Sequence, residues 1–97
     1  MNATENFYII SYDLKRPHQD YPKLYETIKS FLSWQHPLES TWVVYTRYNA
    51  NEISNRLRNE GEMDDNDLLL VCRLEIQDRQ GWLDKTFWEW IKSMLSA

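Results

Sequence analysis

A carboxylate and three basic side chains gather at the end of the first apolar segment of the chain. Asp13 closes the apolar run 7–14, and Lys15, Arg16 and His18 follow it. A strand that gives way to a loop fixes a side chain and leaves space for a ligand, so Asp13 is a candidate metal ligand or general base. Lys15, Arg16 and His18 could contact a phosphate beside it. The alternatives are an aspartate that forms a turn with its own backbone, and a solvated basic loop.

A lone carboxylate is a poor site for a divalent ion, because such ions take several oxygen ligands. A symmetry-related subunit would supply a second carboxylate if the two Asp13 strand ends met across a dimer axis. Neither histidine has metal-ligand spacing with another ligand, and zinc, phosphate-loop, dinucleotide-binding and nucleophile-elbow motifs are absent. His36 precedes Pro37 and is predicted to be a turn residue rather than a proton-transfer group.

The remaining candidates are a serine and several tryptophans. Ser40 has no adjacent base to activate it and is predicted to be a hydroxyl at the start of a strand. Trp42 could stack on a nucleobase, but on an apolar strand it is predicted to lie in the core. Trp82, Trp88 and Trp90 could form a stacking surface. Packing against the sheet or against a second subunit is the preferred interpretation.

Length and composition indicate one soluble domain spanning residues 1–97. An apolar content of 42% and an aromatic content of 14% can fill a core and leave rings for an interface, which favours a dimer. The single cysteine, Cys72, lies in an apolar run and is predicted to be a small core residue in a reducing, cytoplasmic protein. No segment is long and apolar enough for a membrane span. The net charge of −4, with the acidic excess in residues 62–97, argues mildly against tight nonspecific binding of nucleic acid.

Hydrophobic periodicity predicts four strands and three helices. The predicted strands are 7–14, a short segment within 34–39, 40–46 and 68–74, and the predicted helices are 21–34, 49–60 and 83–96. Asp20, Asn49 and Asp84 are the predicted helix caps, and Gly61 follows the second helix. The nearly unbroken apolar strand 68–74 predicts that both of its faces are covered or paired. The order indicates an α+β, ferredoxin-like βαββαβ sandwich (core 7–74) with an additional C-terminal helix and the first two helices on one face.

Three segments together resemble one protein family. The opening 8–14, Tyr-Ile-Ile-Ser-Tyr-Asp-Leu, resembles the first strand of the second CRISPR-associated protein, Cas-two. The segment 38–44 is similar to that family's second signature, a serine followed two residues later by an aromatic, and 66–71 is similar to its fourth strand. The closest resemblance is to small Cas-two-like proteins labelled SinR-family, which carry the same Ser-Tyr-Asp-Leu start and a His-x-Leu-Glu-Ser-Thr-Trp centre, here 36–42.

The resemblance implies a ferredoxin-like homodimer related to the VapD endoribonucleases. In that family the first-strand aspartates of two subunits face each other and are proposed to hold a divalent metal. Carried over, Asp13 becomes the catalytic and metal-site residue, with Mg²⁺ or Mn²⁺ as the expected ion, and Ser40 and Trp42 occupy substrate-binding positions beside Lys15 and Arg16. The expected activity is hydrolysis of RNA, more than DNA, or of another phosphodiester in a CRISPR, toxin–antitoxin or antiviral defence module.

Two features depart from the family pattern. The chain is acidic, and its last segment is an aromatic helix where Cas-two proteins usually have a fifth strand that exchanges between subunits. These departures disfavour a DNA-adaptor role. The alternative function is a non-catalytic dimeric adaptor or regulator that binds a protein partner through Trp82, Trp88 and Trp90; recognition of a small nucleotide at the dimer cleft is a third.

Overall fold

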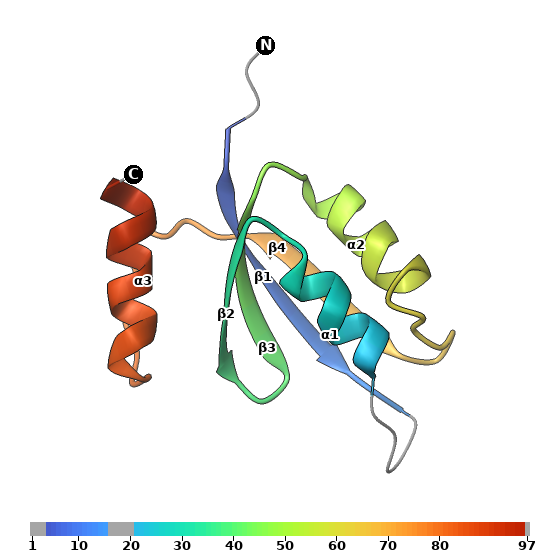
Figure 1. The fold of residues 1–97 in the computed structure, drawn as a ribbon. Helices are drawn as coiled ribbons and strands as arrows, with labels where there is room; N and C mark the ends of the chain where they lie inside the picture. Colours follow the sequence, from blue (N-terminus) through green and yellow to red (C-terminus); the bar gives the residue numbers. More distant parts are fainter. Residues whose placement is uncertain (1–3, 16–20, 97) are drawn as a thin grey trace.

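Strands and helices follow one another in the described residues in the order strand, helix, strand, strand, helix, strand, helix (Figure 1). The structure, a computed structural model, describes residues 4–15 and 21–96. The elements are β1 (Asn6–Asp13), α1 (Pro22–Lys29), β2 (Ser33–Leu38), β3 (Thr41–Thr46), α2 (Ala50–Asn59), β4 (Leu68–Arg73) and α3 (Lys85–Ser96). The predicted α+β class and order of elements are confirmed.

The strand that ends in Asp13 lies inside the sheet. The strand order is β2-β3-β1-β4, and β1 is antiparallel to both of its neighbours. Near the end of β1, the Tyr12 N–H donates to the Ser40 carbonyl oxygen at 3.1 Å and so ties the strand to the turn before β3. Asp13 lies opposite Leu68 on β4. The carboxylate therefore sits on a strand that is fixed from both sides almost to its last residue.

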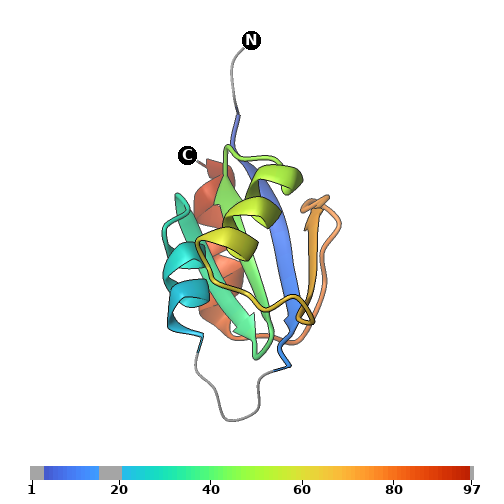
Figure 2. The same cartoon turned by 90° about the vertical axis from the view of Figure 1, so that its right-hand side faces the viewer.

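Helices α1 and α2 cover one face of the sheet, as predicted (Figure 2). Alternate side chains of a strand point to opposite faces, so the even-numbered residues of β1 enter the core beneath these helices. The buried residues of this core are Tyr8, Ile10, Tyr12, Tyr21, Leu24, Ile28, Phe31, Trp42, Val44, Ile53, Leu57 and Met63. Each of its fully buried aliphatic side chains contributes roughly 1.5–3 kcal/mol relative to exposure.

Helix α1 is shorter than predicted. It ends at Lys29, whereas the apolar periodicity predicts helix to residue 34. Trp34 and Gln35 instead pair with β3, opposite Val44 and Val43, so the strand ladder overrides the helical pattern there. The predicted cap Asp20 lies outside the described residues.

Helix α2 begins as the sequence predicts. The Asn49 side chain accepts the Glu52 N–H at 2.8 Å and the Glu52 side chain accepts the Asn49 N–H at 2.9 Å, which completes a capping box. Gly61 follows the helix as predicted, although the positive φ of 54° belongs to Glu62. A Cβ on Gly61 would lie 2.3 Å from the Leu57 carbonyl oxygen. Glycine is required here because of close packing, not because of left-handed backbone.

Helix α3 lies on the opposite face of the sheet (Figure 1). A second, smaller core holds it there, made of Phe7, Val43, Phe87, Trp90 and Ile91. The Trp90 ring meets Phe7 edge-on at 5.6 Å between centroids, and its Nε1–H donates to Ser33 Oγ at 2.8 Å. Helix α3 therefore packs where β1 begins and leaves the part of this face near Asp13 uncovered.

Strand β4 contradicts the prediction that both of its faces are covered. Leu69 and Val71 pack against the main core, but Leu68 and Leu70 are 57% and 56% exposed on the other face. Cys72 is exposed on the same face, so its predicted place in the core is wrong. The physical reason is the position of α3, which packs near Phe7 and Ser33 and does not cover this edge of the sheet.

Candidate functional site

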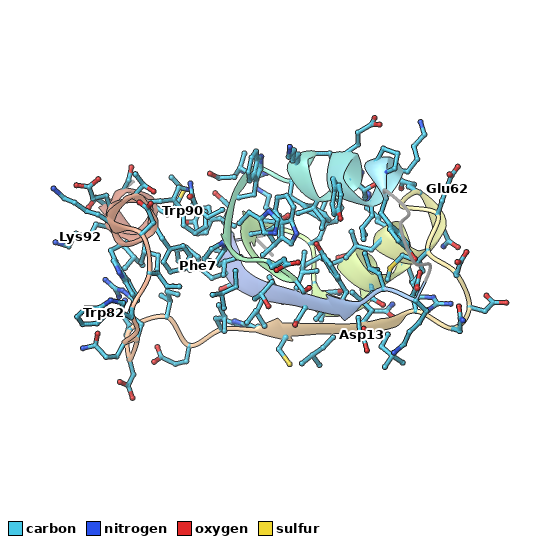
Figure 3. The ribbon with its side chains drawn as sticks, turned by 90° about the horizontal axis from the view of Figure 1, so that it is seen from below. Phe7, Asp13, Glu62, Trp82, Trp90 and Lys92 are labelled. Atoms are coloured by element: carbon cyan, nitrogen blue, oxygen red, sulfur yellow. The ribbon has the colours of Figure 1, made fainter. Side chains whose placement is uncertain are left out.

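Asp13 presents its carboxylate to solvent at the end of β1. Its side chain is 63% exposed, and Oδ2 accepts a hydrogen bond from Lys15 Nζ at 2.6 Å. Phe7 belongs to the core under α3, and Asp13 lies six residues further along the strand, so both point to the same face of the sheet (Figure 3). The structure thus places the predicted carboxylate and one predicted cation in direct contact. Arg16 and His18 lie outside the described residues.

A buried carboxylate holds the backbone behind this ion pair. Asp67 is 3% exposed, and its Oδ1 accepts the Lys15 backbone N–H at 2.8 Å and the Tyr21 hydroxyl at 3.1 Å. Its Oδ2 accepts the Asp64 N–H at 2.8 Å. Asp67 therefore joins the end of β1, the start of α1 and the start of β4 at one point.

Asp67 is not among the candidate residues named from the sequence, where it ends the polar, acidic segment 62–67. The available signal was its place directly before an apolar strand, where an Asp side chain commonly bonds to nearby backbone N–H groups. Its bond to Lys15 spans 52 residues and requires knowledge of the strand pairing.

The surface around Asp13 is largely apolar and is not covered by any described helix. We call it the uncovered patch; it consists of Ser11, Asp13, Leu38, Thr41, Leu68, Leu70 and Cys72. Leu38 is 54% exposed, similar to Leu68 and Leu70. Ser11 Oγ and Thr41 Oγ1 lie 3.2 Å apart and share a hydrogen bond. A shallow hollow next to Asp13 is lined by Ser11, Leu68 and Leu70.

One subunit does not supply a complete site for a divalent ion among the residues described. No group of three or more His, Cys, Asp or Glu side chains gathers in those residues. Asp13 offers one carboxylate, and Lys15 occupies one of its oxygens. The described part of one chain therefore does not fit Mg²⁺ or Mn²⁺, and a second copy of Asp13 would bring further oxygen ligands.

Ser40 and Trp42, the predicted substrate-binding residues, differ in accessibility. Ser40 is exposed in the turn before β3, whereas Trp42 is 2% exposed. The His36 ring stacks on Trp42 with centroids 3.7 Å apart, and its Nε2 lies 2.9 Å from the Glu39 carbonyl oxygen. His36 thus lies in β2 rather than in the predicted turn. Contact between a substrate and Trp42 stays a prediction that would require movement of His36.

Trp42 is also tied to the strand that carries Asp13. Its Nε1–H donates to the Tyr12 hydroxyl at 2.9 Å inside the core. Burial disfavours the charged phenolate and raises the pKa of Tyr12 to about 12, against the smaller opposing effect of the Trp42 hydrogen bond. Tyr12 therefore acts as a neutral structural anchor directly before Asp13.

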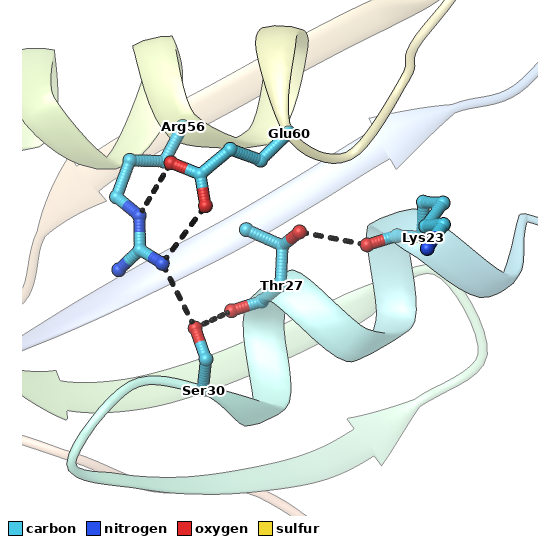
Figure 4. A network of polar contacts seen from close by, with 5 residues as sticks. All are labelled: Lys23, Thr27, Ser30, Arg56 and Glu60. Carbon is cyan, nitrogen blue, oxygen red and sulfur yellow. Dashed lines mark hydrogen bonds and ion pairs between the residues drawn. The ribbon is translucent and has the colours of Figure 1, made fainter.

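A second polar cluster lies between α1 and α2 (Figure 4). Arg56 donates from Nε and Nη2 to the two carboxylate oxygens of Glu60, each at 3.2 Å, and from Nη2 to Ser30 Oγ. The Glu60 hydrogen bond raises the pKa of Arg56, and Arg56 lowers the pKa of Glu60. The guanidinium also stacks over Phe31 and Tyr48. With its charge already matched, this cluster joins the two helices and is a poor anion site.

The C-terminal tryptophans do not form one surface. Trp90 is buried against Phe7, Trp88 is partly buried, and Trp82 is fully exposed. A groove of about 270 Å³ lies between the sheet and the α3 segment, and its lining includes Leu38, Leu83 and Trp88. Trp82 and this groove are what remains of the predicted aromatic interface.

Comparisons of the chain with protein-family models, with curated proteins and with solved structures return no match. Within the described residues, no helix has the length and apolar character needed to cross a membrane.

Proposed function

We propose that the chain forms a homodimeric, metal-dependent phosphodiesterase with Asp13 of both subunits at the shared site. The preferred substrate is RNA, and the preferred setting is a defence module. The proposal includes a Cas-two-like, ferredoxin-like arrangement. Its supports are the order βαββαβ and the antiparallel strand order β2-β3-β1-β4.

The observation that carries the proposal is an exposed carboxylate on an apolar surface that has no cover. Asp13 is 63% exposed and lies opposite Leu68 on the uncovered patch. Exposed leucines gathered on one face mark an interaction surface more often than isolated ones do. Two copies that buried these patches against each other would bring their Asp13 side chains toward the two-fold axis.

The roles of the chain's own residues follow from this arrangement. Two Asp13 carboxylates would hold Mg²⁺ or Mn²⁺, an ion that activates water and offsets negative charge on a phosphate. Lys15 Nζ already lies 2.6 Å from Asp13 and would turn toward a phosphate oxygen once the ion takes its place. Asp67 keeps the Lys15 backbone in position through its 2.8 Å hydrogen bond.

The test is cleavage of single-stranded RNA, duplex DNA and a dinucleotide by wild-type protein with Mg²⁺ or Mn²⁺. Asp13→Asn keeps the side-chain size and removes the charge, so we expect at least about a 100-fold loss of cleavage, the upper range for changes at the outer shell of a metal site. Glu26→Gln, at an exposed position on α1 and so on the other face of the sheet, is the matched control and should keep full activity. Cleavage by Asp13→Asn at the wild-type rate would refute the proposal.

A second candidate is a non-catalytic adaptor that binds a protein partner, supported by the fully exposed Trp82 and by the groove at α3, whose lining includes the next residue, Leu83. Trp82→Ala should then leave the melting temperature unchanged, since the ring makes little contact, yet abolish co-purification of the partner from the native cell. Asp13→Asn should retain the partner. Cleavage that depends on Asp13, together with equal partner recovery by Trp82→Ala, would count against this candidate.

A further inference from the structure

We infer that the outer edge of β4 is a pairing surface for a second copy of this chain, with the two β4 strands antiparallel across a two-fold axis. Among the described residues β4 pairs with β1 alone, and it is an edge of the sheet. Seen from below, no described strand or helix lies beyond it (Figure 3).

The backbone of β4 presents a free row of hydrogen-bonding groups along this edge. The Leu74 N–H donates to the Phe7 carbonyl at 2.9 Å, so Leu74 points its backbone groups toward β1. Because the direction alternates along a strand, Leu69, Val71 and Arg73 direct their N–H and C=O groups outward. The strand has no proline and no charge until Arg73, so it lacks the usual protection of an exposed edge.

The side chains along the same edge are apolar where a partner strand would lie. Leu68, Leu70 and Cys72 alternate on one face of β4, and all three are exposed. In an antiparallel pair these residues would meet the partner's Leu68, Leu70 and Cys72 side by side. Cross-strand apolar pairs of this kind stabilise sheets, and they remove exposed leucine surface from water.

The charges at the two ends of β4 match those of an antiparallel second copy. The acidic segment 62–67 precedes the strand and Arg73 ends it. Antiparallel pairing brings Arg73 beside the partner's Asp65, whose side chain is fully exposed. A register centred on Leu70 places Arg73 opposite the partner's Asp67 and diagonal to the partner's Asp65. A register centred on Val71 instead places Arg73 opposite the partner's Leu69, and Glu75 faces a partner aspartate in both registers. We therefore expect the register centred on Leu70, because only that register sets Arg73 directly opposite a carboxylate.

Edge pairing is separate from the association that the proposed function requires. Two β1 strands in an edge-paired dimer lie three strand spacings apart, roughly 14 Å, which is too far for two Asp13 carboxylates to share an ion. The inference therefore does not rest on the nuclease proposal. If both associations occur, the assembly contains four copies. Two copies are joined through their β4 edges, and each such pair faces another pair through the uncovered patches.

Disulfide trapping tests the pairing and its register. In a Cys72→Ser background, Leu70→Cys places the two new thiols at a non-hydrogen-bonded pair about 4.5 Å apart between Cα atoms, within the range that a disulfide accepts. We expect rapid formation of a covalent dimer under mild oxidant. Trp82→Cys in the same background is the control, because that site is fully exposed and lies at the α3 end of the molecule, away from β4 (Figure 3). Leu70→Cys that cross-links no faster than this control overturns the inference.

Charge reversal tests the same surface without a cross-link. Arg73→Glu and Asp65→Lys should each raise the dimer dissociation constant at least about 10-fold in sedimentation equilibrium, and the double variant should restore it, as expected for a directly coupled pair. Asp13→Asn should leave the trapping rate of Leu70→Cys unchanged, because Asp13 lies on β1, one strand in from the edge. Its effect on cleavage is measured separately, which separates failure of this inference from failure of the nuclease proposal. A wild-type protein that stays monomeric at high concentration, or single variants that associate as tightly as wild type, would also overturn it.

Discussion

Replacing Asp67 with alanine should destabilise the protein and release the backbone beside Asp13. The carboxylate is 3% exposed and accepts hydrogen bonds from the N–H groups of Lys15 and Asp64 and from the Tyr21 hydroxyl. Hydrogen bonds to a charged group contribute about 1.5–3 kcal/mol each, but the Lys15 N–H is only partly buried and can regain water. We therefore expect a loss of about 3–5 kcal/mol in the free energy of unfolding.

Urea denaturation monitored by tryptophan fluorescence measures this loss, and Asp67→Asn is the matched variant. Asparagine keeps an oxygen for Lys15 and Tyr21 but turns an NH₂ group toward the Asp64 N–H, so its loss should be intermediate, about 1–3 kcal/mol. Amide hydrogen exchange at Lys15 should quicken in Asp67→Ala more than in Asp67→Asn. A loss below about 1 kcal/mol for Asp67→Ala, or equal losses for the two variants, would refute the role assigned to this carboxylate.

Three further perturbations test the fold around the site. Gly61→Ala should cost about 2–4 kcal/mol in urea denaturation, because its Cβ would lie 2.3 Å from a helix carbonyl oxygen; a cost below about 0.5 kcal/mol would contradict that packing. Tyr12→Phe should cost about 1–3 kcal/mol at pH 7, because the buried Trp42 N–H loses its acceptor. Burial raises the pKa of Tyr12 from 10.0 to about 12 in the folded protein, so its neutral hydroxyl contributes stability below pH 10 that is lost as pH rises toward 12. The difference in unfolding free energy between wild type and Tyr12→Phe should therefore shrink over that interval. A difference that stays constant would contradict the burial of this hydroxyl. Trp90→Phe removes the bond to Ser33 and should cost about 1 kcal/mol with faster amide exchange confined to α3, whereas faster exchange throughout the sheet would contradict a separate core there.

Local signals in the sequence predict most helices and strands. They fail where the structure depends on pairing between strands that are distant in the sequence. The capping box of Asn49 and Glu52 marks the start of α2 from four residues alone, and the structure confirms it. The end of α1 could not be found in this way, because Trp34 leaves the helical pattern to pair with Val44 on β3. Hydrophobic periodicity reports which residues prefer burial, but not whether the chain has enough helix to cover them.

The residues of the candidate site also differ in whether local sequence signals predict them. Asp13 and Lys15 were found because a strand that ends in charged residues is visible in the sequence, and the structure places them 2.6 Å apart. Asp67 was missed because its partners come from residues 15, 21 and 64, which only the β1–β4 pairing brings together. The uncovered side of Leu68 and Leu70 was unforeseen for a related reason, since an unbroken apolar strand is typical of burial on both faces.

The separate small core beneath α3 divides the molecule into two units that differ in the free energy needed to open them. Five buried residues hold α3, whereas twelve hold α1, α2 and the sheet together, so transient detachment of α3 should cost far less than global unfolding. Each detachment would bare Phe7 and Val43 and extend the apolar surface of β4 across the sheet. In this transient state α1 and α2 would still cover one face of the sheet, and the other face would be exposed to solvent. Such a state is prone to aggregate. Hydrogen exchange that is uniformly slow in α3 and β1 would show that the two units open only together.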